Sequence, residues 1–137
     1  MSSAPTSERP RVTTALEDDV WRVTLDSPDT GNALDLPMIG QLRAALAARP
    51  AAARAVLLLG NGDRFCVGGD VPGYADSEDL PTLVGELATG WSEVIRGLLY
   101  CQVPVVAGVH GTVAGPGMGL LGACDICLLY TSPSPRD

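Results

Sequence analysis

The order of hydrophobic and polar positions predicts strands that alternate with helices. Residues 20–25 alternate apolar and polar side chains, which is the period of a strand with one buried face. Residues 55–59 and 103–109 are short and uniformly apolar, as is typical of parallel strands covered on both faces. Residues 79–100 predict a helix, because apolar side chains recur there at helical spacing: Leu80, Leu83, Leu87, Trp91, Val94, Ile95 and Leu98. This order predicts an α/β fold with a parallel sheet and right-handed connections.

Two further helices are predicted from the residues at their ends. Asp35 is placed to cap a helix whose first turn contains Pro37, and one face of that helix would bury Met38, Leu42 and Leu46. Pro50 is expected to end this helix, because proline cannot donate the next helical hydrogen bond. Residues 115–123 predict a glycine-rich loop that leads into a helix of small residues.

Composition narrows the class of protein. A hydrophobic share of 46% in 137 residues is enough for one packed core, and so for one globular domain. The net charge is −7, and the nine basic residues are all arginine and form no cluster, which argues against nucleic-acid binding. Polar residues interrupt the apolar stretches, and residues 1–11 lack the apolar run of a secretory signal. We therefore expect no membrane segment and a cytoplasmic location.

The four cysteines do not predict a disulfide framework or a metal site. Cys124 and Cys127 form one isolated pair, with no second pair and no neighbouring histidine to complete four ligands. We expect buried thiols and no bound metal.

The two ends of the chain depart from the pattern of the middle. Residues 127–137, CLLYTSPSPRD, run from an apolar strand directly into a Ser/Pro string that resembles the translation of a sequencing adapter. We predict that this string is not native and that the natural protein continues beyond Ile126; a native flexible tail is the alternative. Residues 1–11 are predicted to be a flexible N-terminus, and residues 12–126 a partial domain.

Two glycine-rich segments, each following a predicted strand, carry the candidate chemistry. They are LLGNGDRFCVGGD at residues 58–70 and PVVAGVHGTVAGPGMG at residues 104–119. With VTLDSPDTGNALDLPM before them and LLGACDI after them, they resemble the crotonase superfamily, or enoyl-CoA hydratase/isomerase family, over roughly residues 18–126. The resemblance implies a crotonase-like (ClpP/crotonase) fold, a spiral of ββα units, in truncated form.

The resemblance also implies where the substrate binds. In that family two loops present backbone N–H groups to the thioester carbonyl of an acyl-CoA and stabilise an enolate. Matching residue to residue places these oxyanion-hole positions at Val67 and Pro116, with Gly117 as a substitute donor. The residues expected to contact substrate are Gly31, Ala33, Cys66, Gly68, Gly69, Asp70, Gly115 and Gly117. No cofactor is implied beyond the coenzyme A of the substrate, since the spacing of residues 115–119 does not fit a dinucleotide fingerprint.

Two positions depart from the family pattern. Pro116 has no backbone N–H to donate. A hydratase of this family uses two glutamates; the first maps to Gly119, and the second would fall beyond Ile126. Glycine can neither deliver water nor protonate carbon, so a simple hydratase mechanism is not expected. Isomerase, hydrolase and decarboxylase variants stay open, as does a non-catalytic crotonase-like scaffold.

Several reactive side chains have structural interpretations. Asp70 is expected to fix its loop by accepting backbone hydrogen bonds instead of acting as a base. His110, the only histidine, is expected to serve loop geometry, and Cys66 to be a small buried thiol. Residues 27–34 lack the basic residue that family members often carry near the coenzyme A, which leaves Arg64 and Arg22 as candidates.

At the level of the whole protein, the resemblance implies a lyase or isomerase of fatty acid metabolism. It also implies assembly as a homotrimer or a dimer of trimers. The 137-residue chain alone is expected to be inactive.

Overall fold

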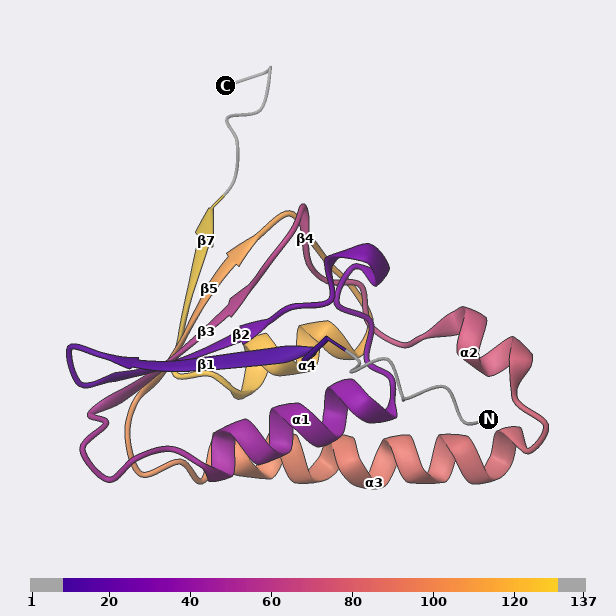
Figure 1. Ribbon diagram of the computed structural model, residues 1–137, viewed down its shortest axis with the longest axis horizontal. Coiled ribbons are helices and arrows are strands. Elements are labelled where there is room, and N and C mark those ends of the chain that lie inside the picture. Colours follow the sequence, from indigo (N-terminus) through magenta and orange to yellow (C-terminus); the bar gives the residue numbers. More distant parts are fainter. Residues whose placement is uncertain (1–8, 131–137) are drawn as a thin grey trace, which may run out of the picture.

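The computed structural model describes residues 9–130, which fold into a twisted sheet covered by helices (Figure 1). The main sheet has five strands in the order β1, β2, β3, β5, β7, while β4 and β6 pair separately. The strands are β1 (Val12–Glu17), β2 (Val20–Leu25), β3 (Ala55–Gly60), β4 (Arg64–Cys66), β5 (Val105–His110), β6 (Thr112–Val113) and β7 (Ile126–Tyr130). The β1–β2 pair is antiparallel, and the other pairings between these strands are parallel, as predicted for the central strands.

The helices connect and cover the parallel strands. They are α1 (Leu36–Ala47), α2 (Val71–Asp76), α3 (Leu80–Leu99) and α4 (Pro116–Ala123), with a 3-10 turn at Pro28–Thr30. Figure 1 shows α1, α3 and α4 on one side of the main sheet, and α2 beyond the end of it. The predicted cap is confirmed, because the Asp35 side chain accepts a hydrogen bond from the Met38 N–H at 2.9 Å.

The core lies between the sheet and these three helices. Its largest fully buried side chains include Phe65, Leu25, Met38, Leu42, Leu58, Leu120, Val23, Val56, Val94 and Val105. Helix packing explains the glycine at position 90 of α3, because a Cβ there would lie 2.9 Å from Cγ2 of Ile39 in α1. The glycine therefore lets α3 pack closely against α1.

Four elements were not predicted from the pattern: β1, α2 and the short strands β4 and β6. Strand β1 is an edge strand whose side chains are exposed or half-buried, so it lacks the alternation that marks a strand with a buried face. Helix α2 is six residues long, too short for a helical period to be read from the sequence. The Asp18 and Asp19 backbones both have positive φ, of 50° and 63°, which matches the tight turn that joins β1 to β2.

The ends of the described chain are tied into the fold. The Arg11 N–H donates to Oε1 of Gln41 at 2.7 Å, and the Arg11 guanidinium pairs with Asp35 at 3.0 Å. Strand β7 includes Cys127, so the first part of the adapter-like string lies beside β5. The rest of that string, residues 131–137, and most of the predicted flexible N-terminus, residues 1–8, lie outside the described residues. The foreign origin of residues 127–137 stays a prediction.

Cysteine burial follows the prediction only in part. Cys66 is buried, but Cys101 and Cys124 are half-buried and Cys127 is exposed on the edge strand β7. Within residues 9–130, no helix is both long enough and apolar enough to cross a lipid bilayer.

Candidate functional site

The two glycine-rich loops lie side by side. Strands β4 and β6 pair in parallel, so the loops that follow them leave the same edge. The Ala114 N–H donates to the carbonyl oxygen of Cys66 at 3.0 Å. A Cβ on Gly68, whose φ is +93°, would lie 2.7 Å from the Ala114 carbonyl oxygen and 3.2 Å from Cδ of Pro116. Contact between the loops therefore requires glycine at position 68.

A third segment completes the site from the turn before α1. The Leu34 N–H donates to the carbonyl oxygen of Gly68 at 2.8 Å, and the Val67 N–H donates to that of Gly31 at 3.0 Å. Gly31, with φ of +68°, and Ala33, which is buried, both lie in this segment. The residues expected to contact substrate are thus brought together around the loop at residues 67–70.

The backbone donors of the two loops are not equally free. The Val67 N–H is engaged by Gly31, and the Gly117 N–H donates to the carbonyl oxygen of Ala114 at 3.0 Å. Pro116 occupies the first turn of α4 and has no N–H. The Gly69 N–H, in contrast, has no hydrogen-bond partner among residues 9–130. Gly69 is therefore the better-placed donor, although the sequence had assigned that role to Val67.

Gly69 opens onto an apolar cavity of about 340 Å³. The loops contribute Gly69 and Pro116 to its wall, and helices and turns contribute the rest: Leu34, Ile39, Tyr74, Val84, Leu87, Ala88 and Trp91. A concave, mostly apolar wall with few polar groups is typical of a small-molecule site. Gly69, whose N–H is free, thus lines a space suited to an apolar group.

Gly119, the position to which the first glutamate of the family maps, faces helix α3. A Cβ on Gly119 would lie 3.7 Å from Nε1 of Trp91 and 3.9 Å from Cδ1 of Ile95. These are ordinary van der Waals distances, so a Cβ at position 119 would be in contact with Trp91 and Ile95 of α3. No carboxylate lines the cavity in the described part of the chain.

Gly117 has a packing role besides its place in the second loop. A Cβ there would lie 2.9 Å from the Cys66 carbonyl oxygen and 3.1 Å from its Sγ. Glycine therefore lets the start of α4 rest directly against the end of β4.

The structure distinguishes the three reactive side chains considered from sequence. Cys66 is confirmed as a buried thiol: burial raises its pKa, and Sγ donates to the Asn32 carbonyl oxygen at 3.3 Å. His110 is confirmed in loop geometry, because its Nε2 lies 2.5 Å from the Gly62 carbonyl oxygen. The prediction for Asp70 is wrong, since its carboxylate accepts no hydrogen bond from any described residue and lies against Gly73 in α2.

The two candidate arginines differ in their surroundings. Arg22 forms an ion pair with Glu17 across the β1–β2 pair. Arg64 lies beside the candidate site: a Cβ on Gly31 would be 2.9 Å from Cζ of Arg64 and 2.7 Å from Cγ1 of Val67. Arg64 has no ion-pair partner within the described residues, so its guanidinium is the one available to a ligand here.

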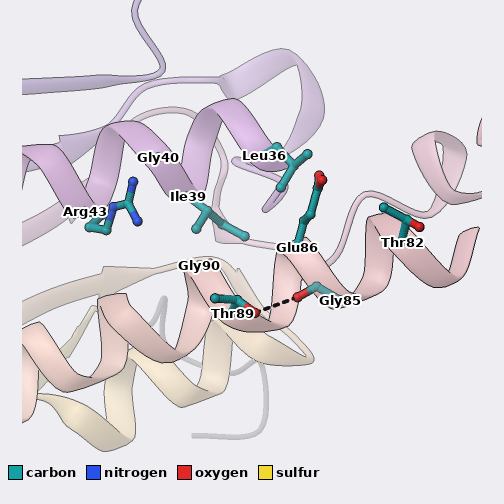
Figure 2. Close-up of a pocket in the computed structure, with 9 residues that line it drawn as sticks. All are labelled: Leu36, Ile39, Gly40, Arg43, Thr82, Gly85, Glu86, Thr89 and Gly90. Carbon is teal, nitrogen blue, oxygen red and sulfur yellow. Dashed lines mark hydrogen bonds between the residues drawn. The ribbon is translucent and has the colours of Figure 1, made fainter.

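A second groove, of about 540 Å³, runs between α1 and α3 (Figure 2). Figure 2 shows Glu86 of α3 directed toward Leu36 at the start of α1, and Thr89 Oγ1 donating to the Gly85 carbonyl oxygen, at 2.9 Å. The groove is larger than the cavity at Gly69, but none of the residues of the two glycine-rich loops lines it. It therefore brings no loop donor to a ligand.

Seven of the residues that line the cavity were not singled out as site residues from sequence: Leu34, Ile39, Tyr74, Val84, Leu87, Ala88 and Trp91. Among them, Trp91 was assigned to a buried helix face and Leu34 to a loop motif, while Tyr74 received no role. Their only sequence signal is proximity to the glycine-rich loops or, for Trp91, its place in an apolar stripe. Such a stripe is more often core than binding site.

Comparisons with known proteins agree on one family. A sequence profile of enoyl-CoA hydratase/isomerase matches residues 15–134. The Rhodobacter capsulatus protein named "Probable enoyl-CoA hydratase" is 36% identical over 111 residues, which are 80% of this chain and 42% of that protein. The (7aS)-7a-methyl-1,5-dioxo-2,3,5,6,7,7a-hexahydro-1H-indene-carboxyl-CoA hydrolase of Mycobacterium tuberculosis is 32% identical over 119 residues, 85% of this chain and 47% of that protein.

Solved structures give the same picture. The enoyl-CoA hydratase of Mycobacterium smegmatis matches with a TM-score of 0.82 and 27% identity, over 88% of this chain and 48% of that one. The chain thus spans less than half the length of these relatives. The relatives also differ in their named reactions, since a hydratase and a hydrolase both match.

Proposed function

The chain belongs to the enoyl-CoA hydratase/isomerase family, and on that premise we propose that it binds an acyl-CoA at the cavity beside Gly69. The thioester carbonyl accepts a hydrogen bond from the Gly69 N–H, and the acyl group occupies the apolar cavity. The observation that carries this proposal is the unengaged Gly69 N–H on the wall of that cavity. A preorganised donor of this kind stabilises the negative charge of an enolate oxygen.

The position of the donor differs from the residue-to-residue match. Because the Val67 N–H is engaged by Gly31, an oxyanion at Val67 would require that hydrogen bond to break. Gly69 needs no such rearrangement.

Arg64 is proposed to contact the phosphate groups of the coenzyme A moiety. Its guanidinium lies next to Gly31, which belongs to the segment that the sequence associates with the coenzyme. Arg64 also forms no ion pair within residues 9–130. Arginine suits this role because its planar guanidinium binds phosphate oxygens in a bidentate manner.

The reaction is proposed only to the level of enolate stabilisation. Hydration of a double bond requires groups that transfer protons, and the described wall of the cavity carries no carboxylate. Pro116 and Gly119 favour a second candidate function, a family member that binds acyl-CoA without turning it over.

Calorimetric titration tests the binding proposal. We expect octanoyl-CoA to bind more tightly than free coenzyme A, because only the former fills the cavity. Ala88→Phe on the cavity wall should weaken octanoyl-CoA binding and leave free coenzyme A unchanged. The matched control, Ala44→Phe, places the same side chain at an exposed position of α1. Equal affinity for the two ligands would contradict the proposal.

A kinetic experiment separates the enzyme from the non-catalytic binder. Because the 137-residue chain alone is expected to be inactive, the protein is expressed from its whole gene and incubated with an enoyl-CoA, and the absorbance of the conjugated thioester is followed. Loss of that absorbance with multiple turnovers supports an enzyme. Binding without turnover supports the second candidate function.

A further inference from the structure

The cavity at Gly69 contains polar groups that the family resemblance does not explain. Its wall is apolar apart from the backbone of Gly69 and two aromatic side chains with a hydrogen-bond donor, Tyr74 and Trp91. Within residues 9–130, neither the Tyr74 hydroxyl nor Nε1 of Trp91 has a hydrogen-bond partner. Both donors are therefore available to a ligand.

The Tyr74 hydroxyl lies directly against Gly69. It is the nearest atom to the position that a Cβ on Gly69 would occupy, followed by Cζ of the same ring at 3.0 Å. A side chain at position 69 would displace the tyrosine, so glycine here makes room for the hydroxyl. The Tyr74 backbone is held in α2, because its N–H donates to the Asp70 carbonyl oxygen at 3.0 Å.

On the cavity wall the second loop is represented by Pro116 alone, so no main-chain N–H from this loop lines the cavity to complete a two-donor site. Pro116 lacks an N–H, and the Gly117 N–H is engaged by Ala114. A carbonyl oxygen bound to the Gly69 N–H has a second lone pair that is free to accept another hydrogen bond. The Tyr74 O–H can rotate about its C–O bond to donate to it.

We propose that Tyr74 is the second hydrogen-bond donor to the thioester oxygen and replaces the backbone N–H that Pro116 removes. This inference rests on the proposed acyl-CoA binding at Gly69. Trp91 is the weaker alternative, because its Nε1 lies near Gly119, one turn further along α4. The atoms nearest to the Cβ position of Gly69 belong to Tyr74 and not to Trp91.

The test reads the thioester carbonyl directly. Octanoyl-CoA labelled with ¹³C at the carbonyl is bound to the 137-residue chain, and the carbonyl stretch is recorded by isotope-edited infrared difference spectroscopy. Hydrogen bonds to the oxygen lower this frequency. We expect Tyr74→Phe to remove roughly half of the shift, since one of two donors is lost. Tyr100→Phe, at an exposed tyrosine after α3, should leave it unchanged.

The outcomes separate the two proposals. An unchanged carbonyl frequency in a folded Tyr74→Phe that still binds octanoyl-CoA overturns the role of Tyr74 and leaves the proposed function standing. A loss of the shift in Trp91→Phe, with Tyr74→Phe unchanged, assigns the donor to Trp91 and also overturns it. No binding by the unmodified chain overturns the proposed function and the Tyr74 role with it.

A second measurement covers the case in which Tyr74→Phe does not fold. The chain has three tyrosines, so the double variant Tyr100→Phe/Tyr130→Phe retains Tyr74 alone. Incorporation of 3-fluorotyrosine into this variant makes the hydroxyl a stronger donor. We expect a larger carbonyl shift than with ordinary tyrosine. An identical shift would overturn the assignment.

Discussion

The fully buried Asn32 side chain donates a hydrogen bond from Nδ2 to the carbonyl oxygen of Phe65 at 3.0 Å. The same Nδ2 lies 3.0 Å from the Asn61 carbonyl oxygen and 3.1 Å from that of Arg64, while Oδ1 accepts from the Ser27 N–H at 2.7 Å. One amide therefore joins the turn before α1, the turn after β3, and β4. These are the segments that hold the first glycine-rich loop.

Replacing this amide should destabilise the fold. We expect Asn32→Ala to lower the free energy of unfolding by about 2–3 kcal/mol, because buried main-chain groups lose their partners. Urea denaturation measures the change. Asn32→Asp is the matched variant: it keeps the size and the acceptor but cannot donate, so it should be at least as destabilising. A loss below about 0.5 kcal/mol for Asn32→Ala would show that water satisfies these groups.

Two glycines of α4 should respond in opposite ways to alanine. Gly117→Ala is expected to be destabilising, because its Cβ would collide with the Cys66 backbone, whereas Gly122 has nothing within 4 Å of a Cβ. Gly122→Ala should instead stabilise the chain by up to about 1 kcal/mol, from helix propensity. Thermal melts of the two variants make the comparison. Equal effects would mean that α4 does not rest against β4 as described.

Coenzyme A affinity should depend on Arg64. We expect Arg64→Gln to weaken binding of free coenzyme A by about 2- to 5-fold at low salt, the scale of an exposed ion pair. The difference should shrink as salt is added. Arg54→Gln is the control, because Arg54 is exposed and precedes β3 at the opposite end of the parallel strands. Calorimetric titration gives both affinities, and equal weakening by the two variants would remove Arg64 from the site.

Stability should fall in alkaline solution through the thiols. Burial, with smaller contributions from Cys127 and Asp125, raises the pKa of Cys124 from 9.0 to about 11. Because the folded chain holds this proton to higher pH than the unfolded chain, the linked stability is complete below pH 9 and is lost as pH rises through about 11. Urea denaturation from pH 8 to 11 measures the slope, which Cys124→Ala should reduce. An unchanged slope in that variant would assign the loss to other groups.

The sequence predicted the strands, the helix cap and the fold better than it predicted the hydrogen-bond donors of the candidate site. The central strands, the Asp35 cap and the crotonase-like fold follow from periodicity, turn chemistry and motif order, and the solved relatives confirm the fold. The choice of Val67 or Gly69 as the free backbone donor depends on which N–H donates to the Gly31 carbonyl oxygen. That hydrogen bond, of 3.0 Å from Val67, joins two separate segments, and no local sequence pattern encodes it. Tyr74 was missed because short α2 has no readable period, and only the folded chain brings its hydroxyl to Gly69.

Trp91 has a consequence for how this chain can be observed. The sequence contains two tryptophans, and Trp21 is buried with its Nε1 donating to the Ala45 carbonyl oxygen at 2.9 Å. Trp91 instead lines the cavity beside Gly119. A molecule that enters the cavity changes the polarity around one indole and leaves the other as a constant background. The intrinsic fluorescence of the chain is thus a built-in optical reporter of occupancy, with Trp91→Phe as its blank.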